Sequence, residues 1–473
     1  MLGEADSGFE AHLRDALPTA AFRHDDTAYR EHPRGAPLGR DALVVAPSTV
    51  AEVSQVIKAA AEARVAVIPY GGGTGLVTGQ VLPEGARPVV LTLERMRAIR
   101  SIHPTENVLV AEAGAILADV QQAAQAEDRL FPLSLASEGS ARIGGLLATN
   151  AGGVNVLRYG NARDLCLGLE AVLPDGSVWH GLKRLRKDNT GYDLRNLLIG
   201  AEGTLGVITA ASLRLYPIPV GRGTALLKVA NPAAALDLLA LAGKRIGTGI
   251  SAFELISGQG PRFLQETMPD IRLPFDEPWP WSVLIDLGLA ASQDPGAALE
   301  GLFEAAVTDG LVNDGIIAQS EAQRTELWAM RESIPLGNRN IGAIASHDIS
   351  LPLSHIPAFI DRAPQKLAQL GSFRINCFGH LGDGNLHFNL FPLPGEERQA
   401  RLADKAAATR IVHDLVDEMD GSISAEHGVG RLKVKDLERY GDPTKLAAMR
   451  AIKAALDPHG IMNPGAVLAA PTP

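Results

Sequence analysis

Residues 375–390, INCFGHLGDGNLHFNL, mix apolar and polar positions in a pattern that predicts a β-hairpin. Successive side chains of a strand point to opposite faces of the sheet, and Asp-Gly between apolar runs is a strong hairpin-turn signal. A turn centred on Asp383 and Gly384 would place His380 directly opposite His387. The two faces then carry Asn376, His380, His387 and Asn389 on one side and, towards the core, Cys377, Leu381, Leu386, Phe388 and Leu390 on the other.

The two histidines allow two interpretations. Directly opposed residues of a hairpin have Cβ atoms about 5 Å apart, a reach at which two imidazoles can bind one metal ion. A pair of hydrogen-bonded or solvated histidines on an exposed sheet face would produce the same sequence pattern. The hairpin residues alone leave both interpretations open.

Elements of mixed type are expected near the N-terminus. A helix is predicted over residues 47–63, opened by a capping box in which Thr49 and Glu52 are three residues apart. Short apolar runs predict strands at 65–68 and 89–93. A second Asp-Gly hairpin is expected at residues 173–178, within an α+β pattern.

The glycine-rich loop PYGGGTGL, residues 69–76, joins the first two of these strands. No helical period follows it, and its spacing matches neither a dinucleotide-binding fingerprint nor a P-loop. A run of backbone amides can nevertheless bind phosphate without a helix, although a simple surface turn would have the same composition. Further small residues at 137–153 and 200–209 favour main-chain contacts to a cofactor, because glycine lets a ligand approach the backbone closely.

The chain has 473 residues, of which 46% are hydrophobic and 21% charged, as is ordinary for folded globular proteins. This length predicts two or three domains. A net charge of −10 argues against a nucleic-acid or anionic-membrane surface. The two cysteines, Cys166 and Cys377, indicate a reducing compartment without a disulfide framework.

The distribution of apolar and charged residues also bears on where in the cell the protein is expected. No run of about 18 apolar residues predicts a membrane span, and the first residues, MLGEADSGFE, lack the basic and apolar regions of a signal peptide. We therefore expect a cytoplasmic protein and leave peripheral association with the inner membrane open.

Five motifs follow one another along the chain and read PYGGGTGLVTGQV, SEGSARIGGLLATNAGGVNVLRYGN, DNTGYDLRNLLIGAEGTLGVIT, FGHLGDGNLHFNL and SAEHGVGRLK. Together they resemble the motifs of the FAD-linked D-2-hydroxyacid dehydrogenases of the vanillyl-alcohol oxidase superfamily, and the resemblance covers roughly residues 40–468. That family includes D-lactate dehydrogenase, D-2-hydroxyglutarate dehydrogenase and glycolate oxidase D subunit types. The resemblance implies an α+β fold with a two-subdomain FAD-binding domain at 1–220. A cap domain with an antiparallel sheet and the metal site would follow at 221–450, and a C-terminal helix and tail at 451–473 would return to the FAD domain.

The resemblance also assigns cofactor residues. It implies that the glycine loop binds the pyrophosphate and that later segments line the rest of FAD. The residues concerned are Pro69, Gly71, Gly72, Gly73, Thr74, Gly75, Ser137, Gly144, Gly145, Thr149, Asn150, Gly152, Gly153, Glu202, Gly206, Ile208 and Asn463. Relatives with covalent flavin carry a histidine where this loop has Thr74, so we expect non-covalent FAD.

Chemistry at the substrate is implied by four further positions. A metal site usually needs about three protein ligands, and Glu426 is expected to join His380 and His387 around a divalent ion, zinc or manganese. Adjacent residues cannot easily both bind one metal, so with Glu426 as the ligand His427 is left as a free base. By resemblance, His427 matches the catalytic histidine of the family. Two substrate contacts, Arg331 to the carboxylate and Asn389, complete the expected catalytic and substrate-binding set.

The activity implied is oxidation of a D-2-hydroxy acid, D-lactate or a related acid, by hydride transfer to flavin N5. Electrons would pass to an electron-transfer flavoprotein, a quinone or a cytochrome, and a homodimer is compatible with the sequence. Dicarboxylate-specific members carry a threonine and a lysine where this chain has Pro335 and Ser346, which casts doubt on D-2-hydroxyglutarate unless His347 replaces the lost donor. A glycolate oxidase D-like subunit of a larger complex is the alternative, and a metal-dependent hydrolase or a non-catalytic flavin protein are the rival classes.

Overall fold

The computed structural model describes residues 2–35 and 37–470, which form two units. The first unit comprises residues 1–152, 160–218 and 426–473, and the second comprises 153–159 and 219–425. The chain returns to the first unit at Glu426, so residues 426–450, which the sequence assigned to the cap, group with the FAD-binding part instead. Among the residues that the structure describes, no helix has the length and apolarity that a membrane crossing requires.

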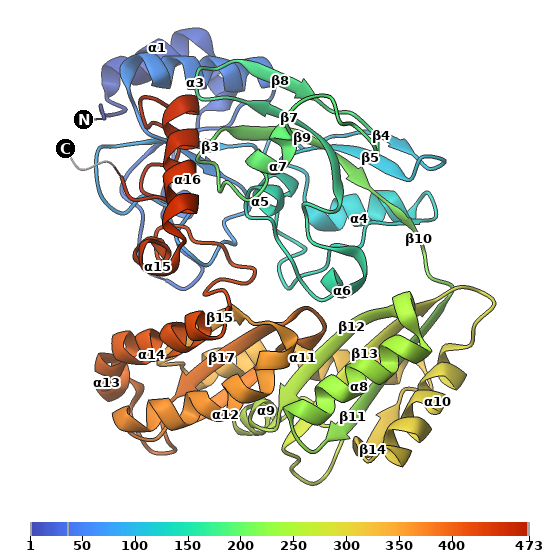
Figure 1. Cartoon of the computed structure of the whole chain (residues 1–473). Helices are drawn as coiled ribbons and strands as arrows, with labels where there is room; N and C mark the ends of the chain where they lie inside the picture. Colours follow the sequence, from blue (N-terminus) through green and yellow to red (C-terminus); the bar gives the residue numbers. More distant parts are fainter. Residues whose placement is uncertain (1, 36, 471–473) are drawn as a thin grey trace. The chain divides into compact units, whose positions relative to one another are not determined.

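The first unit mixes short helices with small sheets (Figure 1). Three parallel strands pair in the order β1-β3-β2, five antiparallel strands pair in the order β4-β5-β9-β7-β8, and β10 pairs with β6. The strands are β1 (Leu43–Val45), β2 (Val67–Tyr70), β3 (Val89–Thr92), β4 (Ile99–His103), β5 (Val108–Glu112), β6 (Arg129–Leu130), β7 (Cys166–Val172), β8 (Val178–Gly181), β9 (Val207–Arg214) and β10 (Tyr216–Pro217). The helices are α1 (Ser7–Ala16), α2 (Thr27–Arg30), α3 (Val50–Ala63), α4 (Leu117–Gln125), α5 (Ile143–Ala148), α7 (Leu194–Leu198), α15 (Val434–Tyr440) and α16 (Pro443–Leu456).

The predicted elements of this unit are present. Helix α3 starts after Thr49, whose hydroxyl accepts the Glu52 amide at 3.2 Å, and the Glu52 carboxylate accepts the amide of Ser48 at 2.6 Å. Residues 71–88 contain no helix, as expected, and β7 and β8 form the second Asp-Gly hairpin. The C-terminal segment returns to this unit, because Met462 bridges Val67 at the edge of β2.

The second unit is built on one antiparallel sheet of seven strands, ordered β14-β11-β13-β12-β16-β17-β15. Its strands are β11 (Gly221–Val229), β12 (Ile250–Ser257), β13 (Trp281–Leu289), β14 (Val312–Ile317), β15 (Ala345–Ser350), β16 (Arg374–His380) and β17 (Asn385–Phe391). Its helices are α6 (Val156–Tyr159), α8 (Pro232–Arg245), α9 (Gln259–Thr267), α10 (Pro295–Thr308), α11 (Glu321–Ile341), α12 (Ile356–Leu367), α13 (Arg398–Arg401) and α14 (Lys405–Glu418). The α+β class and the antiparallel cap sheet are confirmed.

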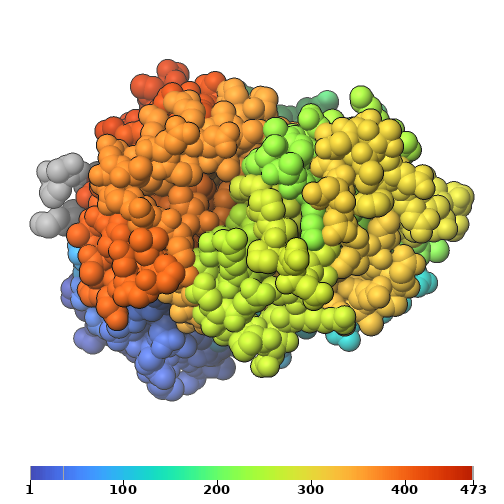
Figure 2. Space-filling model, turned by 90° about the horizontal axis from the view of Figure 1, so that it is seen from below, coloured from blue at the N-terminus to red at the C-terminus, as the bar shows by residue number. Residues whose placement is uncertain are grey.

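Helices cover both faces of this sheet. One face packs against α8, α10, α12 and α14 through a large apolar cluster that includes Leu238, Phe359 and Val412. The other face packs against α9 and α11 through a smaller cluster with Leu264 and Met330. Figure 2 shows one outer face of this unit, where the green and yellow segments adjoin the orange ones. The functional side chains of the hairpin lie on the α9 and α11 side of the sheet.

Candidate functional site

A pocket of about 1070 Å³, counting its open mouth, lies within the first unit. Fourteen residues that the sequence singled out line it: Pro69, Gly71, Gly72, Gly73, Thr74, Gly75, Gly144, Gly145, Thr149, Glu202, Gly206, Ile208, His427 and Asn463. Four expected cofactor residues are not part of this lining, namely Ser137, Asn150, Gly152 and Gly153. The Asn150 side chain instead accepts the backbone amide of Arg163 at 2.9 Å.

The shape of the pocket depends on two loops that approach each other backbone to backbone. A Cβ on Gly72 would lie 2.1 Å from the carbonyl oxygen of Ser140, so only glycine fits there. Gly73 has a φ of +72°, in the left-handed region that glycine adopts without strain. The Gln80 side-chain amide donates to the carbonyl of Gly75 at 2.8 Å and holds the loop in this form.

The lining fits a ligand with an anionic part and a flat apolar part. The glycine loop, whose backbone amides could bind phosphate, and the cationic Arg142, whose Nη1 donates to the carbonyl of Gly114 at 2.6 Å, both line the pocket. Apolar side chains that sequence reasoning did not single out, including Leu91, Leu93, Leu146 and Leu198, form the remaining wall. Thr74, on which the expectation of non-covalent FAD rests, is among the lining residues.

Glu202 and Asn463 line the pocket, but their side chains bond to protein backbone. The Glu202 carboxylate accepts the amides of Val429 and Gly430 at 2.7 and 2.8 Å, and so fixes the loop that follows His427. The Asn463 amide donates to the carbonyls of Glu202 and Gly79 at 2.7 and 3.1 Å. Burial raises the pKa of Glu202, and the two amide donors oppose this shift.

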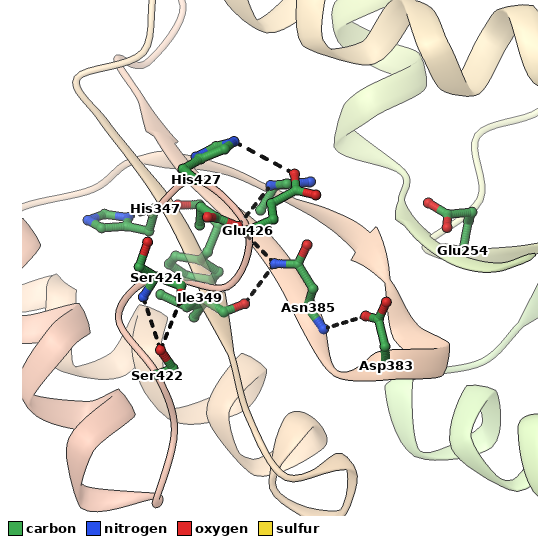
Figure 3. Close-up of polar contacts among 12 residues, drawn as sticks. Glu254, His347, Ile349, Asp383, Asn385, Ser422, Ser424, Glu426 and His427 are labelled. Atoms are coloured by element: carbon green, nitrogen blue, oxygen red, sulfur yellow. Dashed lines mark hydrogen bonds and ion pairs between the residues drawn. The ribbon is translucent and has the colours of Figure 1, made fainter. Parts of the chain in front are cut away.

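Arg431 completes this network. Its guanidinium donates to the carbonyls of Thr78, Gly79 and Pro464 and to the side chain of Asn463, at 2.7 to 3.0 Å. Burial lowers the pKa of Arg431 to about 10, against the attraction of Glu202. The loop with His427, the C-terminal segment and the glycine loops therefore form one hydrogen-bonded assembly. His427 itself lines the pocket, and its Nε2 lies 3.7 Å from the carboxylate of Glu426 (Figure 3).

The hairpin of the second unit forms, but its register differs from the prediction. His387 pairs with Phe378, two residues away from the expected partner, His380. The reason is the turn: Leu381–Asp383 form a short 3₁₀ helix, and Gly384 has a φ of +84°. A type I′ turn would need positive φ at both central residues. A shift of two residues keeps every side chain on its expected face, so the two imidazoles still meet, with ring centroids 5.8 Å apart.

Two carboxylates that the sequence reasoning missed support the histidines. Nδ1 of His380 lies 2.6 Å from Oε1 of the fully buried Glu254 on β12, drawn in green in Figure 3. Nδ1 of His387 lies 3.9 Å from Oδ1 of Asp348, which also accepts the side-chain amide of Asn385 at 2.9 Å. The only signal for Glu254 was a single acid within the apolar strand ISAFELIS.

The residues present fit a divalent cation. Glu426 directly follows Ala425, whose amide donates to the carbonyl of Asp348 at 3.3 Å, so the chain itself brings the Glu426 backbone next to β15. The ligand atoms that His380, His387 and Glu426 offer all lie within 4.8 Å of one another. Two imidazoles and one carboxylate are a ligand set typical of zinc sites with an open position.

Arg331 lies on α11 and is buried, against the same face of the sheet. Its Nε and Nη2 donate to Oε2 of Glu254 at 2.9 and 2.6 Å, and its guanidinium lies 4.8 Å from the centre of the Phe378 ring. Burial raises the pKa of Glu254, but its interactions and hydrogen bonds with His380 and Arg331 outweigh this effect and lower the pKa to about 2. Glu254 therefore occupies the Nε–Nη2 edge of the guanidinium, and the Nη1–Nη2 edge is the one left for another anion.

The remaining substrate positions lie on β15 and β17. Asn389 pairs with Ser346, and both share the sheet face of His387. His347 lies on the opposite face, where its nitrogens contact the Phe388 carbonyl at 2.8 Å and the Thr409 hydroxyl at 3.3 Å. The suggestion that His347 replaces a lost substrate donor is therefore wrong, because strand alternation turns it away from the site.

Comparisons with known families agree with this architecture. Residues 42–181 match the FAD binding domain family, and residues 218–467 match the C-terminal domain of FAD linked oxidases. The chain is 38% identical over 432 residues to the mitochondrial D-2-hydroxyglutarate dehydrogenase of Bos taurus, covering 90% of this chain and 76% of that protein. It is 36% identical over 424 residues to the D-2-hydroxyglutarate dehydrogenase of Xanthomonas citri pv. viticola, covering 89% and 88%.

Solved structures share the fold at low sequence identity. A p-cresol methylhydroxylase with substrate bound superimposes with a TM-score of 0.77 at 16% identity, covering 99% of both chains. An alkyldihydroxyacetonephosphate synthase gives 0.73 at 16% identity, covering 98% of this chain and 85% of that one. With both family domains matched in order along most of its length, the chain belongs to the FAD-linked D-2-hydroxyacid dehydrogenase family and has the vanillyl-alcohol oxidase type of fold.

Proposed function

We propose that this protein is an FAD-dependent dehydrogenase that converts a D-2-hydroxy acid to the 2-oxo acid with the help of a divalent metal. The observation that carries the proposal is that a residue of the cofactor pocket and a candidate metal ligand are adjacent in the sequence. His427 lines the cofactor pocket, and the preceding residue, Glu426, belongs to the group of metal-binding side chains. Consecutive Cα atoms are about 3.8 Å apart, so the chain puts a pocket residue and a metal ligand within reach of one small substrate.

The residues divide the work as follows. His427 takes the proton of the C2 hydroxyl, a task suited to an imidazole near neutral pH. The Nη1–Nη2 end of Arg331 binds the substrate carboxylate, which matches the fork of a guanidinium. Asn389 orients the substrate on the same sheet face. The first unit would hold FAD, which would supply an acceptor for the hydride of C2, and His380, His387 and Glu426 would hold a divalent cation, which would supply a lowered pKa of the substrate hydroxyl.

D-2-hydroxyglutarate is the first substrate we propose, because the relatives at 34–38% identity carry that name. A smaller monocarboxylate such as D-lactate is the second candidate. Ser346 favours this second candidate, because it is a short neutral side chain beside Asn389 on the face of the histidines. It therefore provides no cation to bind the second carboxylate of a dicarboxylate substrate. For the electron acceptor we propose an electron-transfer flavoprotein, a quinone or a cytochrome.

A reduction screen tests the activity. Purified protein should be yellow, and the colour should bleach anaerobically with one or more D-2-hydroxy acids and with none of the L-isomers. A dye acceptor then ranks D-2-hydroxyglutarate against D-lactate. A yellow protein that no D-2-hydroxy acid bleaches would overturn the dehydrogenase proposal and leave a flavin-binding protein without this catalysis.

The metal has its own test. Prolonged chelation followed by removal of the chelator should abolish turnover while FAD remains bound, and Zn²⁺ or Mn²⁺ should restore it. Turnover that survives complete metal removal, measured by elemental analysis of the same sample, would exclude the metal from the mechanism. In Ser346→Lys, the ratio of kcat/KM for D-2-hydroxyglutarate to that for D-lactate should rise, because the new cation can bind the second carboxylate.

A further inference from the structure

We propose that Glu254 is a positioning residue that fixes the metal ligand His380 and the anion-binding Arg331 relative to each other. This inference rests on the proposed function and assigns a role to a side chain that touches neither substrate nor metal. It starts from the geometry of one carboxylate whose two oxygens serve two different partners. Oε1 receives Nδ1 of His380 at 2.6 Å, and Oε2 receives Nε and Nη2 of Arg331 at 2.9 and 2.6 Å.

The contact to His380 determines which nitrogen can bind a metal. A neutral imidazole carries one N–H, and the short contact to a carboxylate assigns that hydrogen to Nδ1. Nε2 is then the nitrogen with the lone pair, and it is the atom that His380 can offer to a cation. A carboxylate behind a metal-binding histidine fixes its tautomer and ring orientation, and losing such a partner typically costs about 10- to 100-fold in metal affinity.

The contact to Arg331 determines which end of the guanidinium meets the substrate. Nε and Nη2 are held by Oε2, so the Nη1–Nη2 end is the one directed away from Glu254. The Phe378 ring, 4.8 Å from the guanidinium carbon, restricts its remaining freedom. Glu254 has no exposed surface, Arg331 is 5% exposed and His380 is 8% exposed, so water does not compete for these bonds.

The shared carboxylate matches the shape of the substrate class. A 2-hydroxy acid carries its carboxylate and its hydroxyl on adjacent carbons, so the group that binds one must stand at a fixed, short distance from the group that binds the other. His380 is directly opposite Glu254 on the neighbouring strand, and Arg331 reaches the same side chain from α11. One rigid acid thus sets the spacing of both, and a change in it should affect metal and substrate together.

A merely structural role would predict a different result, and Asp286 provides the matched control. This buried acid also ties α11 to the sheet, since it accepts hydrogen bonds from Arg324 at 3.2 and 3.3 Å and from Trp328 at 3.2 Å. Its hydrogen-bond partners among the described residues do not include His380 or His387. Asp286→Asn makes the same chemical change as Glu254→Gln, from a buried carboxylate beside an arginine to an amide. Both variants should lose thermal stability, whereas only Glu254→Gln should affect the metal.

The experiment uses FAD-loaded protein stripped of metal and titrated with Mn²⁺, with bound ion measured by electron paramagnetic resonance. We expect Glu254→Gln to bind Mn²⁺ about 10- to 100-fold more weakly and to have a raised KM for D-2-hydroxyglutarate at saturating Mn²⁺. Glu254→Asp, which keeps the charge but shortens the side chain, should restore part of the loss. If Glu254→Gln does not fold by circular dichroism, Glu254→Asp carries the same comparison against Asp286→Asn.

The outcomes separate this inference from the function on which it rests. Wild-type and Glu254→Gln proteins that bind Mn²⁺ equally overturn the role of Glu254 alone. Equal loss of Mn²⁺ affinity in Asp286→Asn also overturns it, because the effect would then come from general loosening of α11. Wild-type protein that binds no Mn²⁺ overturns this inference together with the proposed metal site, while anaerobic bleaching by a D-2-hydroxy acid still tests the dehydrogenase itself.

Discussion

Replacing Gly72 by alanine should weaken FAD binding without unfolding the protein. The added Cβ would lie 2.1 Å from the Ser140 carbonyl oxygen and 3.1 Å from the Cα of Ala141. Real Cβ contacts essentially never fall below 3.0 Å, so the loops must part by at least 0.9 Å, the difference between 3.0 and 2.1 Å. Both obstacles are main chain, which cannot swing aside as a flexible side chain would.

The size of the effect follows from the cost of overpacking. Forcing extra atoms into a close-packed contact costs about 1–3 kcal/mol. If the loops can relax only by leaving the geometry that binds the cofactor, the cost appears as lost affinity, roughly 5- to 150-fold at 1.4 kcal/mol per tenfold change. The apoprotein, with no cofactor to accommodate, should show a much smaller change in Tm.

The assay is a titration of apoprotein with FAD, followed by quenching of flavin fluorescence. Gly139→Ala is the matched control: it lies in the same segment, next to Ser140, and a Cβ there meets nothing within 4 Å. It should bind FAD as the wild type does. A folded Gly72→Ala protein with wild-type FAD affinity would show that the contact between the two loops does not define the cofactor pocket.

Three further outcomes are expected. His427→Gln should keep FAD and bound metal but lower kcat by about 10²- to 10⁴-fold, and wild-type turnover would refute its role as base. Glu202→Gln leaves only one side-chain acceptor for the two loop amides, and each such bond to a charged acceptor is worth about 1.5–3 kcal/mol. The amides of Val429 and Gly430 should therefore exchange hydrogen faster in this variant. Unchanged protection of these amides would contradict the role of Glu202 in holding the loop. Burial raises the pKa of Glu94, but hydrogen bonds from Tyr29 and Arg23 outweigh it and hold the pKa below 4.5. This stabilisation is present above about pH 4.5 and is lost as pH falls through the folded pKa, so the Tm difference between wild type and Glu94→Gln should shrink on acidification, and a constant difference would refute it.

Short-range signals predicted the elements that carry the site. Two-residue alternation placed the apolar residues of the hairpin in the core and His380 and His387 on the other face. The register was not predictable by counting from Asp383 and Gly384, because the 3₁₀ turn adds residues to the connection. Register depends on how the turn packs, and the alternating pattern survives a shift of two residues unchanged.

Long-range partners were beyond local patterns. Glu254 lies 126 residues before His380, and Glu202 lies 227 residues before Val429, so nothing near either acid indicates its partner. Both are single carboxylates in otherwise buried segments. Burying a charge is costly unless it has a partner, so a partner could be expected for each acid, but its identity could not be predicted. Glu202 lines the pocket as expected, and its contact with the cofactor stays a prediction; what the sequence did not indicate is that its carboxylate accepts two backbone amides of the loop after His427.

The bridge between Val67 and Met462 also bears on how the protein is made. Translation delivers the N-terminal strands first, and domains generally begin to fold during synthesis. The edge of β2 nevertheless acquires its last neighbour from a residue nearly 400 positions later, and the Glu202 carbonyl acquires its bond from Asn463, 261 positions later. Flavin loading should therefore follow synthesis of the whole cap, because the pocket of the first unit is incomplete until the segment with His427 and Asn463 has been made.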